Sequence, residues 1–323
     1  MVRTLFASLL TVALATGASA HGANQFAQAA PDGVVVTATE IGSGIWVLDG
    51  QGGNIGVLTG DDGVFVIDSQ FANTAPKNLS KINEISGSAP TYLVNTHWHG
   101  DHTGGNANFG ATIIAHENVR VRLSTDQRTV LLGNERTTPA AAPAARPVIT
   151  FNETLSLHLN GQTISIFHAP AAHTDGDAIV HFKDANVIQL GDVFSPGHFP
   201  FIDISSGGSL DGTIAALTTV LDLCNGETVV IPGRGPLSNI SDIQASRDML
   251  VDVREIILRA IADGMSADEA VTANLLADLK ADWGGGVISA EIFTRLIYDD
   301  LSRTNSVPEV TRVSPPSSAE KVN

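Results

Sequence analysis

The sequence predicts one α/β domain between residues 34 and 303. Short apolar runs bounded by turn residues predict strands in two blocks of the chain. A run with helical spacing interrupts the first block, and helix-start patterns follow the second. Hydrophobic residues make up 43% of the 323 residues, which suffices for one large core or two small ones.

The first block begins as a meander of strands. The turn residues Gly60-Asp61-Asp62-Gly63 predict a hairpin between two of them. A helix at Ala75–Ile85 and a further strand at Thr91–Asn95 then change the pattern to alternation of helix and strand. The strands expected before that helix are Val34–Thr39, Gly44–Leu48, Ile55–Leu58 and Val64–Ile67.

The second block contains four expected strands, with Asn160-Gly161 as a hairpin turn between the first two. Ahead of it, the Pro-rich and Ala-rich segment Thr125–Pro147 has no usable period and predicts a long exposed loop. Such a loop is either a lid over a site or a surface excursion. The four strands are Thr154–Leu159, Thr163–His168, Ala178–Phe182 and Val187–Leu190.

The end of the domain is predicted to be helical. An apolar run predicts a helix at Thr213–Leu223. Ser241 with Gln244, and Ser266 with Glu269, are capping-box patterns, and the first opens an amphipathic run that ends at Gly264. Nothing on these helices suggests chemistry, so we interpret them as packing elements.

Residues 1–20 have the features of a signal peptide. Arg3 precedes the apolar stretch Leu5–Ala15, and Ala18-Ser19-Ala20 forms an A-x-A-like cleavage site. The apolar stretch is shorter than the roughly 20 residues that span a bilayer, which disfavours an anchor. We therefore expect a mature, periplasmic or secreted protein that starts near His21, with a flexible lead at 21–33 and a flexible tail at 304–323.

Composition excludes several classes of partner and scaffold. The single cysteine, Cys224, rules out a disulfide framework and is most simply a packing thiol. A net charge of −16 repels phosphate backbones, and aromatic residues at 5% argue against base-stacking surfaces. We expect a small-molecule substrate, with no nucleic-acid partner and no membrane association after export.

Potential metal ligands are concentrated in the segment Asn95–Asn106, directly after a predicted strand. His97 and His99 lie two residues apart, so on an extended segment they project to the same side. Asp101 and His102 follow the bend at Gly100 and turn toward a neighbouring point. Imidazole and carboxylate ligands together suit zinc or a similar divalent ion.

The pattern His97-x-His99-x-Asp101-His102 resembles the signature of the metallo-β-lactamase superfamily. This resemblance implies an αββα sandwich, in which two packed mixed sheets are flanked by helices and a metal site lies at one edge. It also implies that His97, His99 and His173 hold a first metal, while Asp101, His102 and Asp192 hold a second. Asp68 matches an aspartate that, in the family, contacts the metal ligands without binding the metal itself.

The chain departs from the family pattern at its last expected ligand. The family has His within Pro-Gly-His-Gly-Pro, whereas this chain has Arg234 within Pro232–Pro236. Arginine has no lone pair to give a metal. Three arrangements remain open: Arg234 swings outward, it occupies the second-metal position of a one-metal site, or it clamps a substrate carboxylate.

Other histidines are less informative. His198 follows Asp192 in a loop that lines the site in this family, and it can replace the missing ligand, contact substrate or be exposed. His21 is expected at the mature amino terminus. We interpret four further histidines as structural groups: His116, His158, His168 and His181.

The resemblance implies metal-assisted hydrolysis with zinc as the cofactor. A metal at His97, His99 and His173 would activate water against a carbonyl, with Asp101 orienting that water or handling its proton. A second metal, or Arg234 in its place, would stabilise the leaving anion. Export favours a class B β-lactamase-like activity, followed by a lactonase and then a glyoxalase II-like thioesterase. A catalytically weak metal-binding protein is the alternative from another class.

Overall fold

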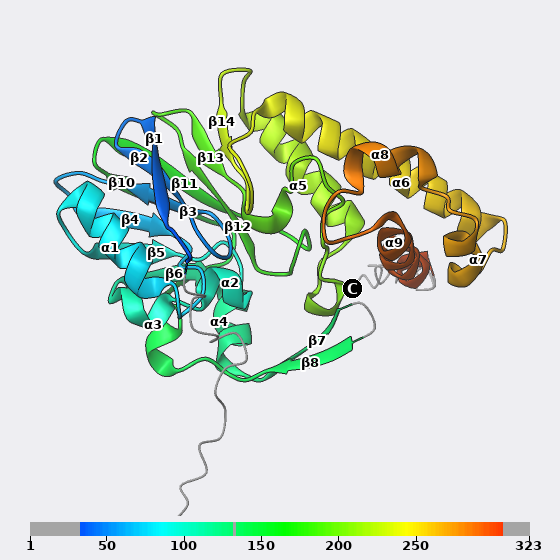
Figure 1. Ribbon diagram of the computed structural model, residues 1–323, viewed down its shortest axis with the longest axis horizontal. Helices are drawn as coiled ribbons and strands as arrows, with labels where there is room; N and C mark the ends of the chain where they lie inside the picture. The colour runs from blue at the N-terminus through cyan, green and yellow to red at the C-terminus, as the bar shows by residue number, and fades with distance from the viewer. Residues whose placement is uncertain (1–32, 132–133, 306–323) are drawn as a thin grey trace, which may run out of the picture.

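The computed structural model describes residues 33–131 and 134–305 and shows a layered α/β sandwich (Figure 1). Two mixed β-sheets pack face to face, and helices cover the outer side of each. The predicted αββα sandwich is confirmed. The expected signal peptide at 1–20 and the residues up to 32 lie outside the described residues.

The first sheet has the order β1-β2-β3-β4-β5-β6-β9. Its first four strands are antiparallel, and β4, β5, β6 and β9 are parallel. The strands are β1 (Thr37–Gly42), β2 (Ile45–Asp49), β3 (Ile55–Leu58), β4 (Val64–Ile67), β5 (Pro90–Val94), β6 (Thr112–His116) and β9 (Ile149–Phe151).

The second sheet has the order β10-β11-β12-β13-β14. It is antiparallel except for the β13–β14 pair, which is parallel. The strands are β10 (Thr154–Leu159), β11 (Gln162–Ala169), β12 (Asp177–Phe182), β13 (Val187–Gln189) and β14 (Val229–Ile231).

Strand alternation separates two cores on either side of the first sheet. Phe65 and Ile67 point into the core between the sheets, where Phe65 contacts Phe182 of β12 edge to face. Val64 and Val66 point the other way, toward the helix α1 (Ala75–Ser86). Two short helices pack on the same side, α3 (Asn106–Phe109) through Phe109 and α4 (Glu117–Ser124) against Ala115 of β6, and the one-turn helix α2 (Gly100–Thr103) follows β5.

A third core lies between the second sheet and the C-terminal helices. Ser266 and Glu269 form the predicted capping box. The box predicted at Ser241 and Gln244 is wrong, because Asn239 caps the helix and pairs with Asp242. The helices are α5 (Leu210–Leu223), α6 (Ile240–Ala262), α7 (Ala267–Thr272), α8 (Lys280–Trp283) and α9 (Ala290–Asn305).

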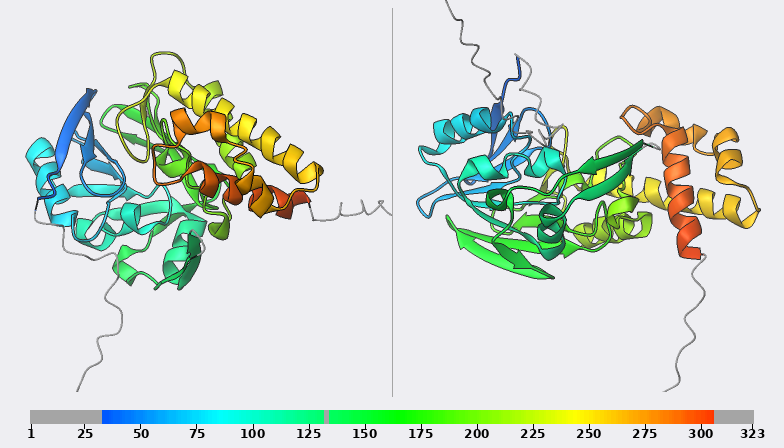
Figure 2. Two further views of the ribbon diagram at one scale, coloured as in Figure 1. Left: turned by 45° about the vertical axis from the view of Figure 1, so that its right-hand side comes forward. Right: turned by 90° about the horizontal axis from the view of Figure 1, so that it is seen from below.

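The segment predicted as a long loop at Thr125–Pro147 contains a hairpin. Strands β7 (Gln127–Leu131) and β8 (Asn134–Thr138) pair antiparallel, and a short 3-10 turn follows at Pro143–Ala145. Figures 1 and 2 show the hairpin reaching from the first-sheet side toward the C-terminal helices. Pairing between two largely polar strands leaves no apolar period, so no pattern in the chain indicated a hairpin here.

Smaller differences concern ends and short elements. Strand β1 begins at Thr37 rather than Val34, and β6, β9, β14 and α4 lie in segments for which no such element was predicted. Helix α9 continues to Asn305, so the first two residues of the predicted tail are helical, and the rest of that tail lies outside the described residues. Within the described part of the chain, no helix has the length and apolarity needed to span a bilayer.

Candidate metal centre

The predicted ligands meet at one end of the sandwich because each follows a strand that ends there. Asp68 comes directly after β4, and His97 follows β5. In the second sheet, Asp192 follows β13 and Arg234 follows β14. His173 lies in the turn between β11 and β12. Both sheets therefore contribute to the site.

The motif changes conformation at Gly100. His97 lies in a bend at residues 96–98 after β5, rather than on a continuous extended segment, and His99 is the residue before helix α2 with an extended backbone. Asp101 and His102 lie in the first turn of that helix. The bend predicted at Gly100 is thus the start of a helical turn, and it separates the two pairs of potential ligands.

Hydrogen bonds behind His97 determine which of its nitrogens is available. The Thr96 hydroxyl donates to Oδ2 of Asp68 at 2.7 Å, so its oxygen accepts from Nδ1 of His97 at 3.1 Å. Nε2 of His97 is buried and makes no hydrogen bond to a described group. This nitrogen is therefore the one that His97 can offer to a metal.

His99 and His173 are oriented in the same manner. Nε2 of His99 donates to Oδ2 of Asp203 at 2.9 Å, and Nδ1 of His173 donates to the carbonyl of Phe201 at 2.7 Å. The remaining nitrogens, Nδ1 of His99 and Nε2 of His173, face each other at 3.0 Å. A metal ion could bind both nitrogens from a position between them, and without a metal a single proton can be shared across this distance.

The three imidazoles fit a divalent metal. One nitrogen each from His97, His99 and His173 lies within 4.8 Å of the others. Metal–nitrogen bonds of about 2.0–2.1 Å in a tetrahedral site place ligand nitrogens about 3.3 Å apart, so small shifts close this set. Burial holds the pKa of His97 well below its usual range and lowers that of His173 to about 4. Both rings are neutral at pH 7, which is the form that binds metal.

His102 belongs to a second group. Its Nδ1 donates to Oδ2 of Asp68 at 2.7 Å, and its Nε2 lies 3.2 Å from Asp192 and 3.5 Å from Asp101. Burial alone would lower the pKa of His102, but Asp192 and Asp68 outweigh it and raise that pKa to about 10. Burial would likewise raise the pKa of Asp192, yet the neighbouring His102 holds it well below its usual range.

Arg234 points into the site. Its Nη2 donates to Oδ2 of Asp101 and, at 3.2 Å, to Oδ2 of Asp192, while 48% of the side chain remains exposed. The outward orientation considered from the sequence is not the one observed. His198 is exposed, its Nδ1 lies 2.8 Å from the carbonyl of Pro196, and it is in neither group of potential ligands. The structure therefore does not support His198 as the replacement ligand.

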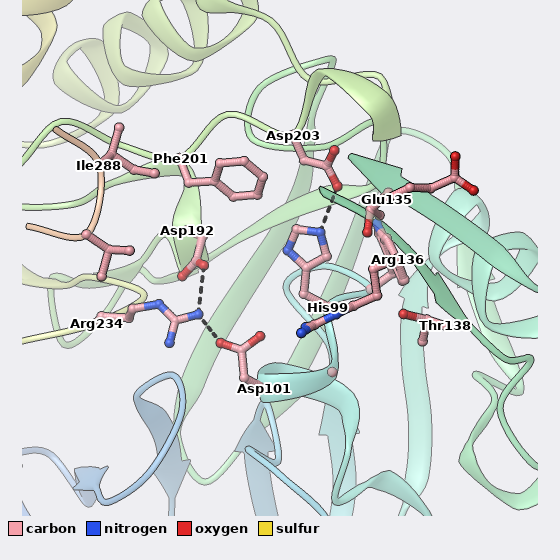
Figure 3. Close-up of a pocket in the computed structure, with 14 residues that line it drawn as sticks. His99, Asp101, Glu135, Arg136, Thr138, Asp192, Phe201, Asp203, Arg234 and Ile288 are labelled. Atoms are coloured by element: carbon pink, nitrogen blue, oxygen red, sulfur yellow. Dashed lines mark hydrogen bonds and ion pairs between the residues drawn. The ribbon is translucent and has the colours of Figure 1, made fainter. Parts of the chain in front are cut away.

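A cavity of about 690 Å³ opens over the centre (Figure 3). One of the two possibilities left open for Thr125–Pro147, a lid over a site, agrees with the position of the β7–β8 hairpin in the cavity wall. Three other wall residues were not predicted: Asp203 and Phe201 after β13, and Ile288 between α8 and α9. The one sequence feature that could have indicated Asp203 is its position directly after the apolar run at residues 199–202. The lining residues are Trp98, His99, Gly100, Asp101, Thr129, Glu135, Arg136, Thr138, Asp192, Phe201, Asp203, Arg234, Val287 and Ile288.

Comparison with known proteins agrees with this geometry. The sequence model of the metallo-β-lactamase superfamily matches residues 48–248, well over half of the chain. The chain belongs to the metallo-β-lactamase superfamily. No curated protein is similar to it at a significant level. Members of this superfamily are metallo-hydrolases, and the three-imidazole group of this chain is suited to a metal.

Solved structures share the superfamily fold at low sequence identity. A metallo-β-lactamase from Pontibacter korlensis has a TM-score of 0.55 and 16% identity, over 67% of this chain and 99% of that one. The metallo-β-lactamase DIM-1 has a TM-score of 0.54 and 16% identity, over 68% and 99%. The stereoselective inverting sec-alkylsulfatase Pisa1 from Pseudomonas sp. has a TM-score of 0.64 and 14% identity, over 82% of this chain but 50% of that one.

Proposed function

We propose that the protein is a zinc-dependent hydrolase that cleaves an amide or ester carbonyl, with β-lactams as the first substrate class. The observation that supports this most directly is the orientation of three imidazoles. His97, His99 and His173 each have one nitrogen bound to a protein group behind the ring and the other directed at a common point. Three imidazole nitrogens around one ion leave a fourth position for water.

A divalent metal at this point would supply Lewis acidity and lower the pKa of water to about 7. The chain's own groups have complementary roles. Asp101 receives Arg234 on Oδ2, which leaves its Oδ1 to orient a nucleophilic water or accept its proton. Arg234 provides positive charge where the leaving anion develops.

The cavity supports a compact substrate with polar and apolar parts. Its volume of about 690 Å³ lies within the usual range for small-molecule sites. Trp98, Phe201 and Ile288 provide apolar wall, while Arg136 and Arg234 provide positive charge. A β-lactam carries an apolar side group and a carboxylate, and two metallo-β-lactamases superpose on this chain over 99% of their length.

A substrate screen at graded zinc tests the proposal. Protein treated with chelator and returned to zinc is assayed with nitrocefin, a lactone and a thioester. We expect nitrocefin turnover that rises with zinc and is lost in His173→Ala, with the exposed His158→Ala as the matched control. Stoichiometric zinc without turnover of any substrate would instead support the catalytically weak metal-binding protein.

A second candidate is hydrolysis of a secondary alkyl sulfate. The superposition on the sec-alkylsulfatase covers 82% of the chain and so reaches beyond residue 239 into the C-terminal helices, whereas those on the β-lactamases cover 67–68%. The loop between α8 and α9 places Val287 and Ile288 in the cavity wall. A secondary alkyl sulfate added to the screen separates the two candidates, since sulfate release without nitrocefin turnover favours the second.

We also propose that the protein acts outside the cytoplasm. Arg3, the apolar stretch Leu5–Ala15 and Ala18-Ser19-Ala20 support export. Amino-terminal sequencing of protein from the periplasm or medium should begin at His21. A chain that starts at Met1 in the cytoplasmic fraction would contradict the proposal.

A further inference from the structure

The loop that carries Arg234 is fixed by one buried side chain. Nδ2 of Asn54 donates to the carbonyls of Pro232 and Gly235 at 3.0 and 2.9 Å, and its backbone N–H donates to that of Gly233 at 2.8 Å. Asn54 is 3% exposed. Three hydrogen bonds from this residue thus fix the backbone on both sides of Arg234, and the side chain itself is held by Asp101 and Asp192.

The guanidinium of Arg234 contacts the same carboxylates that would ligate a second metal. Nη2 reaches Oδ2 of Asp101 and Oδ2 of Asp192. Both carboxylates also lie near Nε2 of His102, with Oδ2 of Asp101 at 3.5 Å and Oδ1 of Asp192 at 3.2 Å. The second group therefore already contains a cation that is charged at every accessible pH. A divalent ion there would be repelled by Arg234 and would compete with it for both carboxylates.

His97 limits the centre further. It belongs to both groups of potential ligands, one with His99 and His173, the other with His102 and Asp192. Its Nδ1 is bound to Thr96, so Nε2 is its single available nitrogen. One lone pair serves one ion. With the side chains as they lie, only one of the two groups can hold an ion through His97. The three-imidazole group is favoured, because Arg234 already contacts Asp192 in the other group.

We infer that the protein binds a single divalent ion, at His97, His99 and His173, and that Arg234 replaces the second ion as a fixed positive charge held by Asp101 and Asp192. This inference rests on the proposed function. Because the guanidinium also lines the cavity and is half-exposed, its remaining N–H groups face the space that substrate would fill (Figure 3). Arg234 is thus placed to receive an anionic group of the substrate.

Metal content tests the inference directly. Protein dialysed against excess zinc and then against buffer is measured by elemental analysis, and a zinc titration of the apoprotein is followed by calorimetry. We expect one ion per chain and one binding step for the wild type. Arg234→His should take two ions, with the second bound at least about 100-fold more tightly than any second ion in the wild type.

Two further variants act as controls. Arg234→Lys keeps the charge and should still take one ion. Arg254→His makes the same arginine-to-histidine exchange at a residue that forms a surface ion pair with Asp211, and this variant should also take one ion. Two ions in the wild type, or one ion in a folded Arg234→His protein, would overturn the inference. Thermal unfolding of each apoprotein establishes that it is folded, and if Arg234→His does not fold, two ions in Arg234→Lys would overturn the inference instead.

The metal count does not depend on turnover. Two ions in an active wild-type enzyme would remove the role of Arg234 and leave the proposed hydrolase intact. One ion with no turnover of any substrate would support the metal stoichiometry and count against the hydrolase.

Discussion

Asp203 accepts a hydrogen bond from Nε2 of His99 at 2.9 Å, and this contact decides which nitrogen of His99 faces the metal position. Asp203 is itself held by the hydroxyls of Ser205 and Ser206, both at 2.5 Å. Burial would raise the pKa of Asp203, but the hydrogen bond from His99 holds it well below its usual range. The carboxylate is therefore charged, and it strengthens the basicity of the opposite nitrogen of His99.

Replacing Asp203 by Asn should weaken metal binding by about 10-fold to 100-fold. An amide keeps contacts to the serines but no longer supplies the negative charge behind His99. The dissociation constant for zinc, from competition with a chelating dye, measures the effect. Asp211→Asn makes the same exchange in a surface ion pair and should leave the constant unchanged. Equal constants for the two variants would show that Asp203 does not support the ligand.

Gly53 leaves no room for a side chain beside His102. A Cβ at this position would lie 2.2 Å from Cε1 of His102. The backbone cannot retreat easily, because Gly53 donates to the carbonyl of Asp101 at 3.1 Å and accepts from Nε2 of Gln70 at 2.8 Å. Gly53→Ala should therefore displace His102 and lower the free energy of unfolding by about 1–3 kcal/mol.

Urea unfolding of the metal-free protein measures this loss. Gly226→Ala is the matched control, because a Cβ there meets no atom within 4 Å. We expect the control to stay within about 0.5 kcal/mol of the wild type. Similar stabilities of the two variants would mean that His102 adapts without cost.

The metal-free protein should be most stable near pH 6.5. The pKa of His173 falls from 6.5 to about 4 on folding, so the unfolded chain binds more protons between these values and the free energy of unfolding falls as the pH is lowered. The pKa of His102 rises from 6.5 to about 10, so the folded protein binds more protons there and stability falls as the pH is raised.

The free energy of unfolding of chelator-treated protein, measured with urea at about pH 5, 6.5 and 8, tests both the fall on the acid side (the acid limb) and the fall on the alkaline side (the alkaline limb). His173→Asn should flatten the acid limb relative to the wild type, and His102→Asn should flatten the alkaline limb. If both variants follow the wild-type profile in parallel, neither imidazole is responsible for the pH dependence.

The sequence predicted the part of the centre that is local in the chain. His97, His99, Asp101 and His102 lie within six residues, and the helix that begins at Gly100 separates the first two of them from the last two. The two blocks of strands were predictable for a related reason, since period-2 patterns and turn residues are local signals.

Long-range contacts account for what the sequence left open. The position of the loop that carries Arg234 depends on Asn54, which lies between β2 and β3 and is far away in the chain. Asp203 becomes important only because the fold brings it to His99. The β7–β8 hairpin is largely polar and has an exposed ion pair between Arg128 and Glu135, so its sequence has no hydrophobic period that would predict two strands. Each of these features is set by tertiary structure rather than by neighbouring residues.

Val287 provides a test of the C-terminal helices as part of the substrate site. The loop between α8 and α9 places it in the cavity wall although 88% of its surface is exposed. Substrate with an apolar group should cover this side chain, so Val287→Ser should raise KM about fivefold, equivalent to about 1 kcal/mol, with kcat unchanged. Val148→Ser, at another exposed valine outside the cavity, should change neither constant. Unchanged KM in both variants would place the apolar group of the substrate elsewhere, because replacing a valine that the substrate covers with a polar serine should weaken substrate binding.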